Sequence, residues 1–280
     1  MSTLIATPRA RALGFSLRTA REERRMGLRE LARLVHFAPG HLHNWEVGIR
    51  VPKESEVGAL AGCLRMTVEE RERLVLLARH AREPNWLESV VPGAPAPAAT
   101  YAECERTATR LFSWQPLLIP GLFQTGDYVR ACLGRQKRIS KDDVEVAVLI
   151  RMARRDVLSR IEQFTSMIGE EALRQNIGDS AIMIDQLHHL LAVAPRRNIA
   201  VRIVPRGLGF HAGLHGCFVL LDYESLPSIV HVEGFRGGAY LYDEADVAAY
   251  RDATKQLAEL ALGEQESIEF IQGVLAELEA

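Results

Sequence analysis

Residues 27–48 read Gly-Leu-Arg-Glu-Leu-Ala-Arg-Leu-Val-His-Phe-Ala-Pro-Gly-His-Leu-His-Asn-Trp-Glu-Val-Gly, and this stretch decides the fold of the N-terminal part of the chain. From Leu28 onward, apolar side chains recur at the i, i+3, i+4, i+7 spacing of one helix face. A second helix is expected from about Pro39 to Glu46, because proline suits the first turn of a helix, where its missing N–H has no partner in any case. The few residues between the two segments predict a tight turn.

The two predicted helices carry side chains that can pack on each other. Leu31 and Ala32 of the first can meet Leu42 and Trp45 of the second, and the small Ala32 permits a close approach. We interpret the pair as a helix-turn-helix, whose second helix enters the major groove of DNA while the first crosses the backbone. Three further helices, which give the N-terminal domain five, are expected at about 13–24, 55–64 and 67–80.

The charge distribution agrees with this interpretation. The 280-residue chain has a net charge of −2, but residues 1–80 carry +5 and residues 81–280 carry −7. A basic N-terminal part on an acidic body is typical of a DNA-binding domain attached to a domain with another task. Double-stranded DNA is therefore the expected partner of the N-terminal part.

Composition narrows the class of protein. Apolar residues make up 48% of the chain and charged residues 25%, as in ordinary globular proteins. No apolar run approaches the roughly 18–20 residues that a membrane helix needs, and the N-terminus lacks the pattern of a secretory signal. The four cysteines contain no CxxC pair, which favours free thiols over disulfides or zinc ligands: Cys63, Cys104, Cys132 and Cys217. We expect a cytoplasmic protein without membrane contact.

Proline marks the expected domain boundary. Periodicity is lost at Pro84, and residues 92–99 read Pro-Gly-Ala-Pro-Ala-Pro-Ala-Ala, which we interpret as a semi-rigid linker that cannot form a helix. The predicted domains are residues 1–83, a Pro/Ala-rich linker at 84–100 and a second domain at 101–280.

The second domain mixes helical and β-like patterns. Helices are expected at 101–113, 124–133, 141–162, 179–192, 245–262 and 265–278. Short strands are expected at 164–168, 199–204, 217–221 and 229–232. The predicted fold class is mainly α, with an N-terminal five-helix helix-turn-helix domain and a C-terminal α+β domain that contains a small sheet.

The N-terminal domain resembles the Cro/repressor-type (xre-family) helix-turn-helix domain of bacterial and phage regulators. The residues that carry the resemblance are Arg21, Leu28-x-x-Leu31-Ala32 and Leu42-x-x-Trp45-Glu46-x-Gly48-x-x-x-Pro52. The resemblance implies a buried ion pair between Arg21 and Glu46 that ties the first helix to the recognition helix. The alternative is a five-helix domain used for protein contacts.

Two sets of residues are candidates for contact with DNA. The resemblance places Pro39 and Gly40 at the positions that most often read bases, and neither side chain carries a donor. Base reading would then fall to His41, His43 and Asn44, since Asn can bond bidentately to adenine and His can donate to guanine. The candidates for phosphate contacts are Arg29, Arg33, Arg50 and Lys53. Each of these cations has the alternative of being a solvated surface charge.

Residues 101–270 resemble the C-terminal domain of actinomycete helix-turn-helix regulators, which include WhiJ-type and antitoxin-like proteins. The most specific match is Trp114-Gln115-Pro116-Leu117-Leu118-Ile119-Pro120-Gly121-Leu122-Phe123-Gln124-Thr125-Gly126-Asp127-Tyr128. We interpret Trp114 and Tyr128 as exposed aromatics beside the polar Gln124 and Thr125. These four residues form either a structural corner or a surface for a partner or ligand.

No catalytic or metal centre is expected. His211, His215, Cys217 and His231 invite a metal assignment, but the glycines around them disfavour a helix, and no HExxH accompanies them. Enzyme motifs such as GxSxG or a P-loop are absent from the sequence. We therefore expect no enzymatic activity and no cofactor.

These observations predict a DNA-binding transcriptional regulator that binds a palindromic operator as a homodimer, with a second domain that senses a partner protein or small ligand. The alternative is an antitoxin-like protein that silences a small cognate partner and regulates its own operon. We expect the dimer contact within residues 100–280. One candidate is the apolar stripe Ile268, Ile271, Val274, Leu275 and Leu278, which could instead pack inside its own domain.

Overall fold

The structure is a computed structural model that describes residues 7–81, 86–89, 96–135, 140–234 and 237–280. The chain forms two compact units. The first unit consists of residues 1–107, 225–229 and 236–243, and the second of residues 108–224, 230–235 and 244–280. Each has a hydrophobic core of its own. No helix among the described residues is long and apolar enough to cross a membrane.

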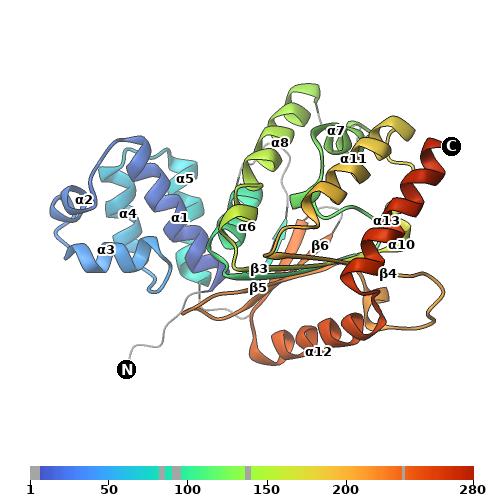
Figure 1. Ribbon diagram of the computed structural model, residues 1–280. Coiled ribbons are helices and arrows are strands. Elements are labelled where there is room, and N and C mark those ends of the chain that lie inside the picture. The colour runs from blue at the N-terminus through green and yellow to red at the C-terminus, as the bar shows by residue number, and fades with distance from the viewer. Residues whose placement is uncertain (1–6, 82–85, 90–95, 136–139, 235–236) are drawn as a thin grey trace. The chain divides into compact units, whose positions relative to one another are not determined.

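Five helices open the first unit, as the sequence predicts (Figure 1). They are α1 (Pro8–Glu23), α2 (Leu28–Leu34), α3 (Pro39–Glu46), α4 (Glu54–Cys63) and α5 (Val68–His80). Their inward faces share one core, in which Leu13, Leu31, Leu42, Leu60 and Leu74 are almost fully buried. Each helix is short, so its stability comes mainly from this tertiary packing. The same unit contains β1 (Trp86–Ser89), α6 (Ala96–Thr107) and β7 (Gly237–Leu241), and β1 pairs antiparallel with β7.

The predicted linker at 84–100 is therefore partly structured. Residues 86–89 form β1, and helix α6 already begins at Ala96, so the prediction that residues 92–99 cannot form a helix is wrong for residues 96–99. Pro97 lies in the first turn of α6, where a missing N–H interrupts no helical hydrogen bond. The remainder, residues 90–95, lies outside the described residues.

The second unit is built on a mixed sheet whose strand order is β6-β5-β2-β3-β4. Strands β2 (Arg110–Gln115), β3 (Gln163–Gly169) and β4 (Ile199–Val204) are parallel, and β5 (Phe218–Asp222) pairs antiparallel with β2. Most of β6 (Ile229–Gly234) also belongs to this unit. The prediction of a helix over 101–113 is wrong beyond Thr107, because residues 110–115 form the central strand, with buried side chains on both of its faces.

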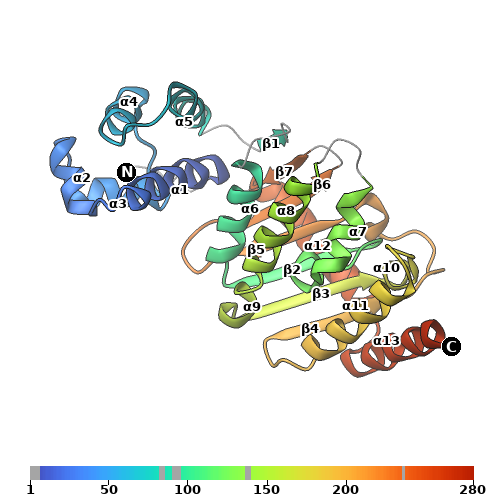
Figure 2. The same ribbon diagram turned by 90° about the horizontal axis from the view of Figure 1, so that it is seen from above.

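Helices cover both faces of this sheet. One face carries α7 (Gly126–Gly134), α8 (Lys141–Arg154) and α11 (Ser180–Val193), and α12 (Glu244–Leu260) lies on the opposite face (Figures 1 and 2). The remaining helical segments are η1 (Gly121–Phe123), α9 (Val157–Arg160), α10 (Glu170–Arg174), η2 (Ala212–His215) and α13 (Glu264–Glu279). Thus the predicted helix 141–162 is two helices, with a turn after Arg154.

The apolar stripe of the last helix packs inside the second unit. Ile271, Val274 and Leu275 of α13 are buried, and the helix contacts α11 and β4. The alternative, in which the stripe packs inside its own domain, is therefore confirmed. These three side chains are not available for contact with a second copy of the chain.

Candidate nucleic-acid interface

A close backbone crossing positions the recognition helix α3 against α1. A Cβ atom added at Gly14 of α1 would lie 2.3 Å from the main-chain oxygen of Trp45 and 2.6 Å from that of Glu46. Only glycine permits this approach. Sequence reasoning missed Gly14, because a glycine inside a helical pattern signals only a weaker helix.

Arg21 and Glu46 meet at the same crossing. The guanidinium donates from Nε to Oε1 at 2.7 Å and from Nη2 to Oε2 at 2.8 Å, while Nη1 donates to the main-chain oxygen of Met26 at 3.0 Å. The exposed fractions are 11% for the Arg21 side chain and 4% for that of Glu46. The hydrogen bond with Glu46 raises the pKa of Arg21 above its usual value. The structure thus brings together the pair that the family resemblance implied, and the pair links α1, the segment before α2 and the end of α3.

The turn between α2 and α3 begins with a residue in the left-handed region. His36 has φ +56°, its N–H donates to Arg33, and the N–H of Phe37 donates to Ala32. This is the Schellman arrangement, in which glycine is the usual residue. The Phe37 ring then packs edge-on against Trp45, with the ring centroids 4.9 Å apart. The tight turn expected between the two helices is thus present, but the left-handed conformation of His36 and the contact of Phe37 with Trp45 were not predicted from the sequence.

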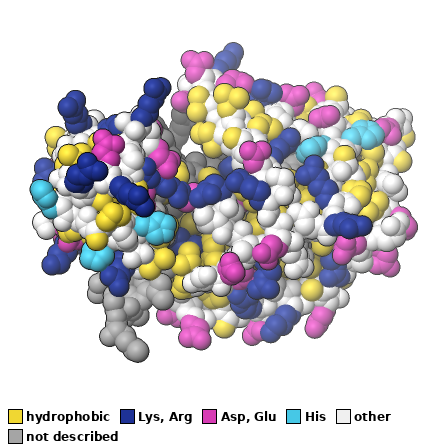
Figure 3. Space-filling view, turned by 60° about the vertical axis from the view of Figure 1, so that its left-hand side comes forward, with side chains coloured by type: hydrophobic (Ala, Val, Ile, Leu, Met, Phe, Trp, Pro, Cys, Tyr) yellow, Lys and Arg dark blue, Asp and Glu magenta, His cyan; other side chains and the backbone are white. Residues whose placement is uncertain are grey.

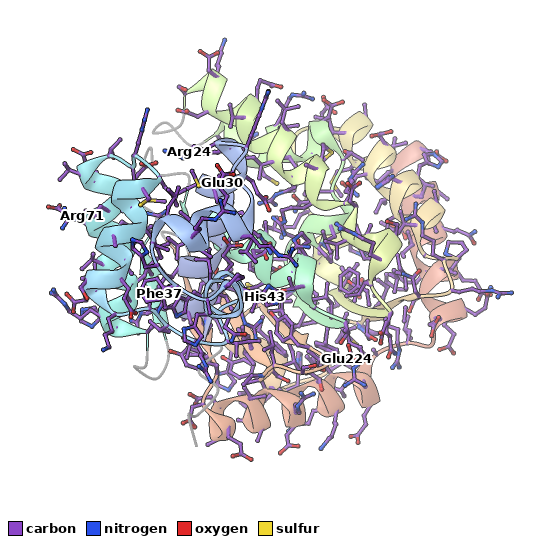
Figure 4. The ribbon with its side chains drawn as sticks, turned by 90° about the vertical axis from the view of Figure 1, so that its left-hand side faces the viewer. Arg24, Glu30, Phe37, His43, Arg71 and Glu224 are labelled. Carbon is purple, nitrogen blue, oxygen red and sulfur yellow. The ribbon has the colours of Figure 1, made fainter. Side chains whose placement is uncertain are left out.

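The predicted base-reading residues lie on the outer part of α3. Pro39, Gly40, His41 and His43 are exposed and Asn44 is half-buried. Nothing lies within 4 Å of a Cβ atom built at Gly40, so the surface of the unit is open there. Figure 4 looks onto these helices with Phe37 and His43 labelled. Three polar side chains are thus available to base edges, and the helix start is open to a close approach.

The four predicted phosphate contacts are exposed cations. Arg29 and Arg33 lie on α2, and Arg50 and Lys53 lie in the segment after α3. None of the four side chains forms an ion pair or hydrogen bond with another described residue, whereas Arg79 of α5 is held by Glu54 at 2.8 Å. Lys and Arg side chains also mark this region in the space-filling view (Figure 3). Unpaired guanidinium and ammonium groups can bind phosphate without first breaking an internal contact.

The two aromatic residues of the second predicted surface are buried in the structure. Trp114 is 2% exposed and Tyr128 is fully buried, so the interpretation of these two as exposed aromatics is wrong. The indole N–H of Trp114 donates to the main-chain oxygen of Gly213 at 2.8 Å, and the Tyr128 hydroxyl accepts from the N–H of Ile119 at 3.2 Å. Burial raises the pKa of Tyr128 above its usual value. Each ring fills the core, and its polar atom has an internal partner, as buried Trp and Tyr require.

The two polar members of that set close a corner of the chain. Gln124 is 4% exposed; its Nε2 donates to Ile119 at 2.6 Å, and its Oε1 accepts from Arg151 of α8 at 2.7 Å. Gln186 of α11 accepts from the N–H of Thr125 at 2.7 Å. The Thr125 hydroxyl caps α7 by accepting from the N–H of Tyr128. Sequence reasoning missed Arg151 and Gln186, because their partners lie tens of residues away.

Two buried nitrogens beside this corner have no hydrogen-bond partner among the described residues: Arg155 Nε and His189 Nε2. Arg155 also donates from Nη2 to the main-chain oxygen of Gln124. Burial lowers the pKa of His189, and the charges of Arg155 and Arg196 lower it further, against Asp185, which raises it. A neutral imidazole therefore lies close to a guanidinium at this corner.

The histidines that invite a metal assignment do not form a ligand set in the described part of the chain, where no group of three His, Cys, Asp or Glu residues could hold a metal ion. His211 instead packs edge-on against Trp114, with the ring centroids 6.2 Å apart. Burial, and then the charge of Arg154, lowers the pKa of His231 to about 4. His211, Cys217 and His231 are half-buried, and His215 is exposed.

Two protein-family models match the chain, one in its N-terminal part and one in the remainder. Residues 98–273 match the family described as Domain of unknown function (DUF5753), which is more than half of the chain. The chain belongs to this family. Residues 12–74 match the family described as Helix-turn-helix domain; they cover most of α1, all of α2, α3 and α4, and about half of α5. No curated protein matches the chain. This DUF5753 protein thus has the N-terminal helix-turn-helix domain of a DNA-binding regulator.

Proposed function

We propose that this DUF5753 protein is a sequence-specific transcriptional regulator that binds a palindromic operator as a homodimer. The observation that carries the proposal is the helix-turn-helix segment, in which α3 presents the polar side chains of His41, His43 and Asn44. Four exposed cations that have no ion pair in the described part of the chain lie on α2 and in the segment after α3. Phosphate contacts fix the register of a protein on the duplex, and base-edge contacts specify the sequence. The helix-turn-helix and the segment after it supply both kinds of group.

The dimer is part of the proposal because one recognition helix contacts few base pairs. Two copies of α3 reading half-sites one helical turn apart, about 34 Å, would give useful selectivity. We further propose that the second unit joins the two N-terminal helix-turn-helix domains of the dimer and responds to a small ligand or a partner protein. The proposal assigns no catalytic role to the chain. The antitoxin-like alternative remains a hypothesis from the family resemblance.

Selection from a random duplex library with the full-length protein tests the proposal. We expect an enriched motif with two inverted half-sites whose centres are about 10–10.5 base pairs apart, or a multiple of that distance. The control variant Lys255→Gln, which removes an exposed cation of α12 in the second unit, should enrich the same motif. Enrichment of no motif, with binding equal for all duplexes, would contradict the sequence-specific role.

A further inference from the structure

Three guanidinium groups at the end of α8 meet one short segment of the second unit. Arg151 donates from Nη1 to Gln124 Oε1 at 2.7 Å, and Arg155, the C-cap residue, donates from Nη2 to the main-chain oxygen of Gln124. A Cβ atom built at Gly121 would lie 3.5 Å from Nη1 of Arg151 and 3.8 Å from Nη2 of Arg154. The three cations therefore lie close together against the same few residues.

Arg155 brings a buried donor to this segment without an acidic partner. Its side chain is half-buried, and its Nε is buried with no hydrogen-bond partner in the described part of the chain. Burial lowers the pKa of the guanidinium, and no ion pair with a described residue offsets that cost. The helix dipole favours cations at the end of α8. It supplies no acceptor for the Nε–H group, however, and a buried donor without an acceptor is unfavourable.

His189 of α11 adds a second unpartnered nitrogen at the same segment. Helices α8 and α11 cover the same face of the sheet (Figures 1 and 2). One turn before His189, Gln186 accepts from the N–H of Thr125 at 2.7 Å and donates to the main-chain oxygen of Phe123 at 2.8 Å. His189 follows at i+3 on that face, and its Nε2 is buried without a partner among the described residues. Burial lowers the pKa of His189 and the charge of Arg155 lowers it further, so the two groups are close.

The chemistry of these groups indicates an anionic ligand. Arginine side chains only donate hydrogen bonds, and a neutral imidazole can donate one. The side-chain and main-chain oxygens of Gln124 already accept from Arg151 and Arg155. Guanidinium groups bind phosphate and carboxylate alike, but the tetrahedral oxygens of phosphate can accept from donors on two helices, whereas a carboxylate accepts mainly in its own plane. Because the three arginines and His189 are each only half-buried, a ligand can reach them from solvent.

We propose that the corner formed by Gln124, Arg155 and His189 binds the phosphate group of a small molecule. Nε of Arg155 and Nε2 of His189 donate to the phosphate oxygens, and Arg151 and Arg154 contribute positive charge. Since both nitrogens are buried, the phosphate reaches them when the half-buried Arg155 side chain changes rotamer. The inference rests on the proposed response of the second unit to a small ligand, and it names the chemical class of that ligand and the side chains that bind it.

Calorimetric titration of the full-length protein with inorganic phosphate, at constant ionic strength, tests the site. Removing one hydrogen bond to a charged group should weaken binding about tenfold or more, so we expect this loss in Arg155→Gln and in His189→Gln. The matched control is Arg160→Gln, which removes the same charge from an exposed arginine of α9 and should bind phosphate as the wild type does. Exposed cations of the first unit can also bind phosphate, so the loss in the two variants, rather than binding itself, locates the site.

Three results would overturn the proposal. They are a wild type that binds no phosphate, folded variants that bind phosphate as tightly as the wild type, and equally tight binding of acetate, which would assign a carboxylate ligand instead. Arg155→Gln also removes the hydrogen bond to Gln124, so the melting of each variant in chloride buffer shows whether it is folded. If Arg155→Gln is unfolded, His189→Gln decides the outcome.

Selection on the duplex library separates this proposal from the proposed function. A protein that loses phosphate binding in Arg155→Gln but enriches no DNA motif contradicts the regulator and leaves the phosphate site standing. A protein that enriches an operator motif but binds no phosphate overturns the phosphate site alone.

Discussion

Replacing Glu46 by alanine is the sharpest test of how the recognition helix is held. The carboxylate accepts two hydrogen bonds of 2.7 and 2.8 Å from Arg21, and both side chains are nearly buried. Removing it leaves the guanidinium with one main-chain hydrogen bond, to Met26, and a 3.5 Å contact with the exposed Glu22, beside a newly formed gap. Removing one partner of a buried ion pair lowers the free energy of unfolding by about 3–5 kcal/mol. Because the Arg21 side chain is 11% exposed and can be partly hydrated, we expect a loss near the lower end, about 3 kcal/mol.

Calorimetry of the full-length protein measures this loss. At roughly 4–8 °C for each kcal/mol in a domain of this size, the transition of the N-terminal unit should fall by about 12–24 °C in Glu46→Ala. The control is Glu54→Ala, which breaks the Arg79–Glu54 pair, whose side chains are 56% and 46% exposed. An exposed pair contributes only about 0–1 kcal/mol, so this variant should melt close to the wild type. Equal melting of Glu46→Ala and Glu54→Ala would refute the reasoning.

Three further predictions follow from particular side chains. Asn44→Ala should relax base preference at one position of each half-site by about 1–3 kcal/mol, whereas Arg50→Ala should weaken all duplexes alike, as measured by selection and by anisotropy. His36→Gly should stabilise the protein by about 1 kcal/mol in urea unfolding, because the left-handed conformation is strained for His, whereas Arg33→Gly, inside α2, should cost about 1 kcal/mol. The pKa of His231 is lowered to about 4 in the folded protein, so as the pH falls the unfolded chain binds a proton before the folded chain does. The free energy of unfolding should therefore be highest above pH 6.5 and fall by up to about 3 kcal/mol between pH 6.5 and 4. His231→Gln should remove most of this pH dependence in urea unfolding.

The helical part of the first unit could be predicted because its signals are local. The spacing of Leu28, Leu31, Ala32 and Val35 and the proline at the start of α3 each act within one helix or one turn. Helix existence and approximate bounds follow directly from such signals. The Arg21–Glu46 contact came from the resemblance, since residues 25 positions apart give no periodic signal.

The second unit was harder because its decisive contacts are long-range. Residues 110–115 form the central strand only because β3 and β5 pair on either side of it, and no alternation of apolar and polar residues marks it. The same strand buries Trp114, which the sequence alone cannot distinguish from an exposed aromatic at a binding surface. Buried strands and buried aromatics are thus decided by tertiary packing.

The salt dependence of DNA affinity tests the central claim most directly. With four phosphate contacts in each of two copies, the logarithm of the association constant should fall with the logarithm of salt concentration with a slope of about −7. In an anisotropy titration of the full-length protein on its selected site, replacing Arg29, Arg33, Arg50 and Lys53 together by glutamine should bring this slope close to zero. A variant slope equal to that of the wild type would contradict the claim that these four cations, on α2 and in the segment after α3, contact DNA.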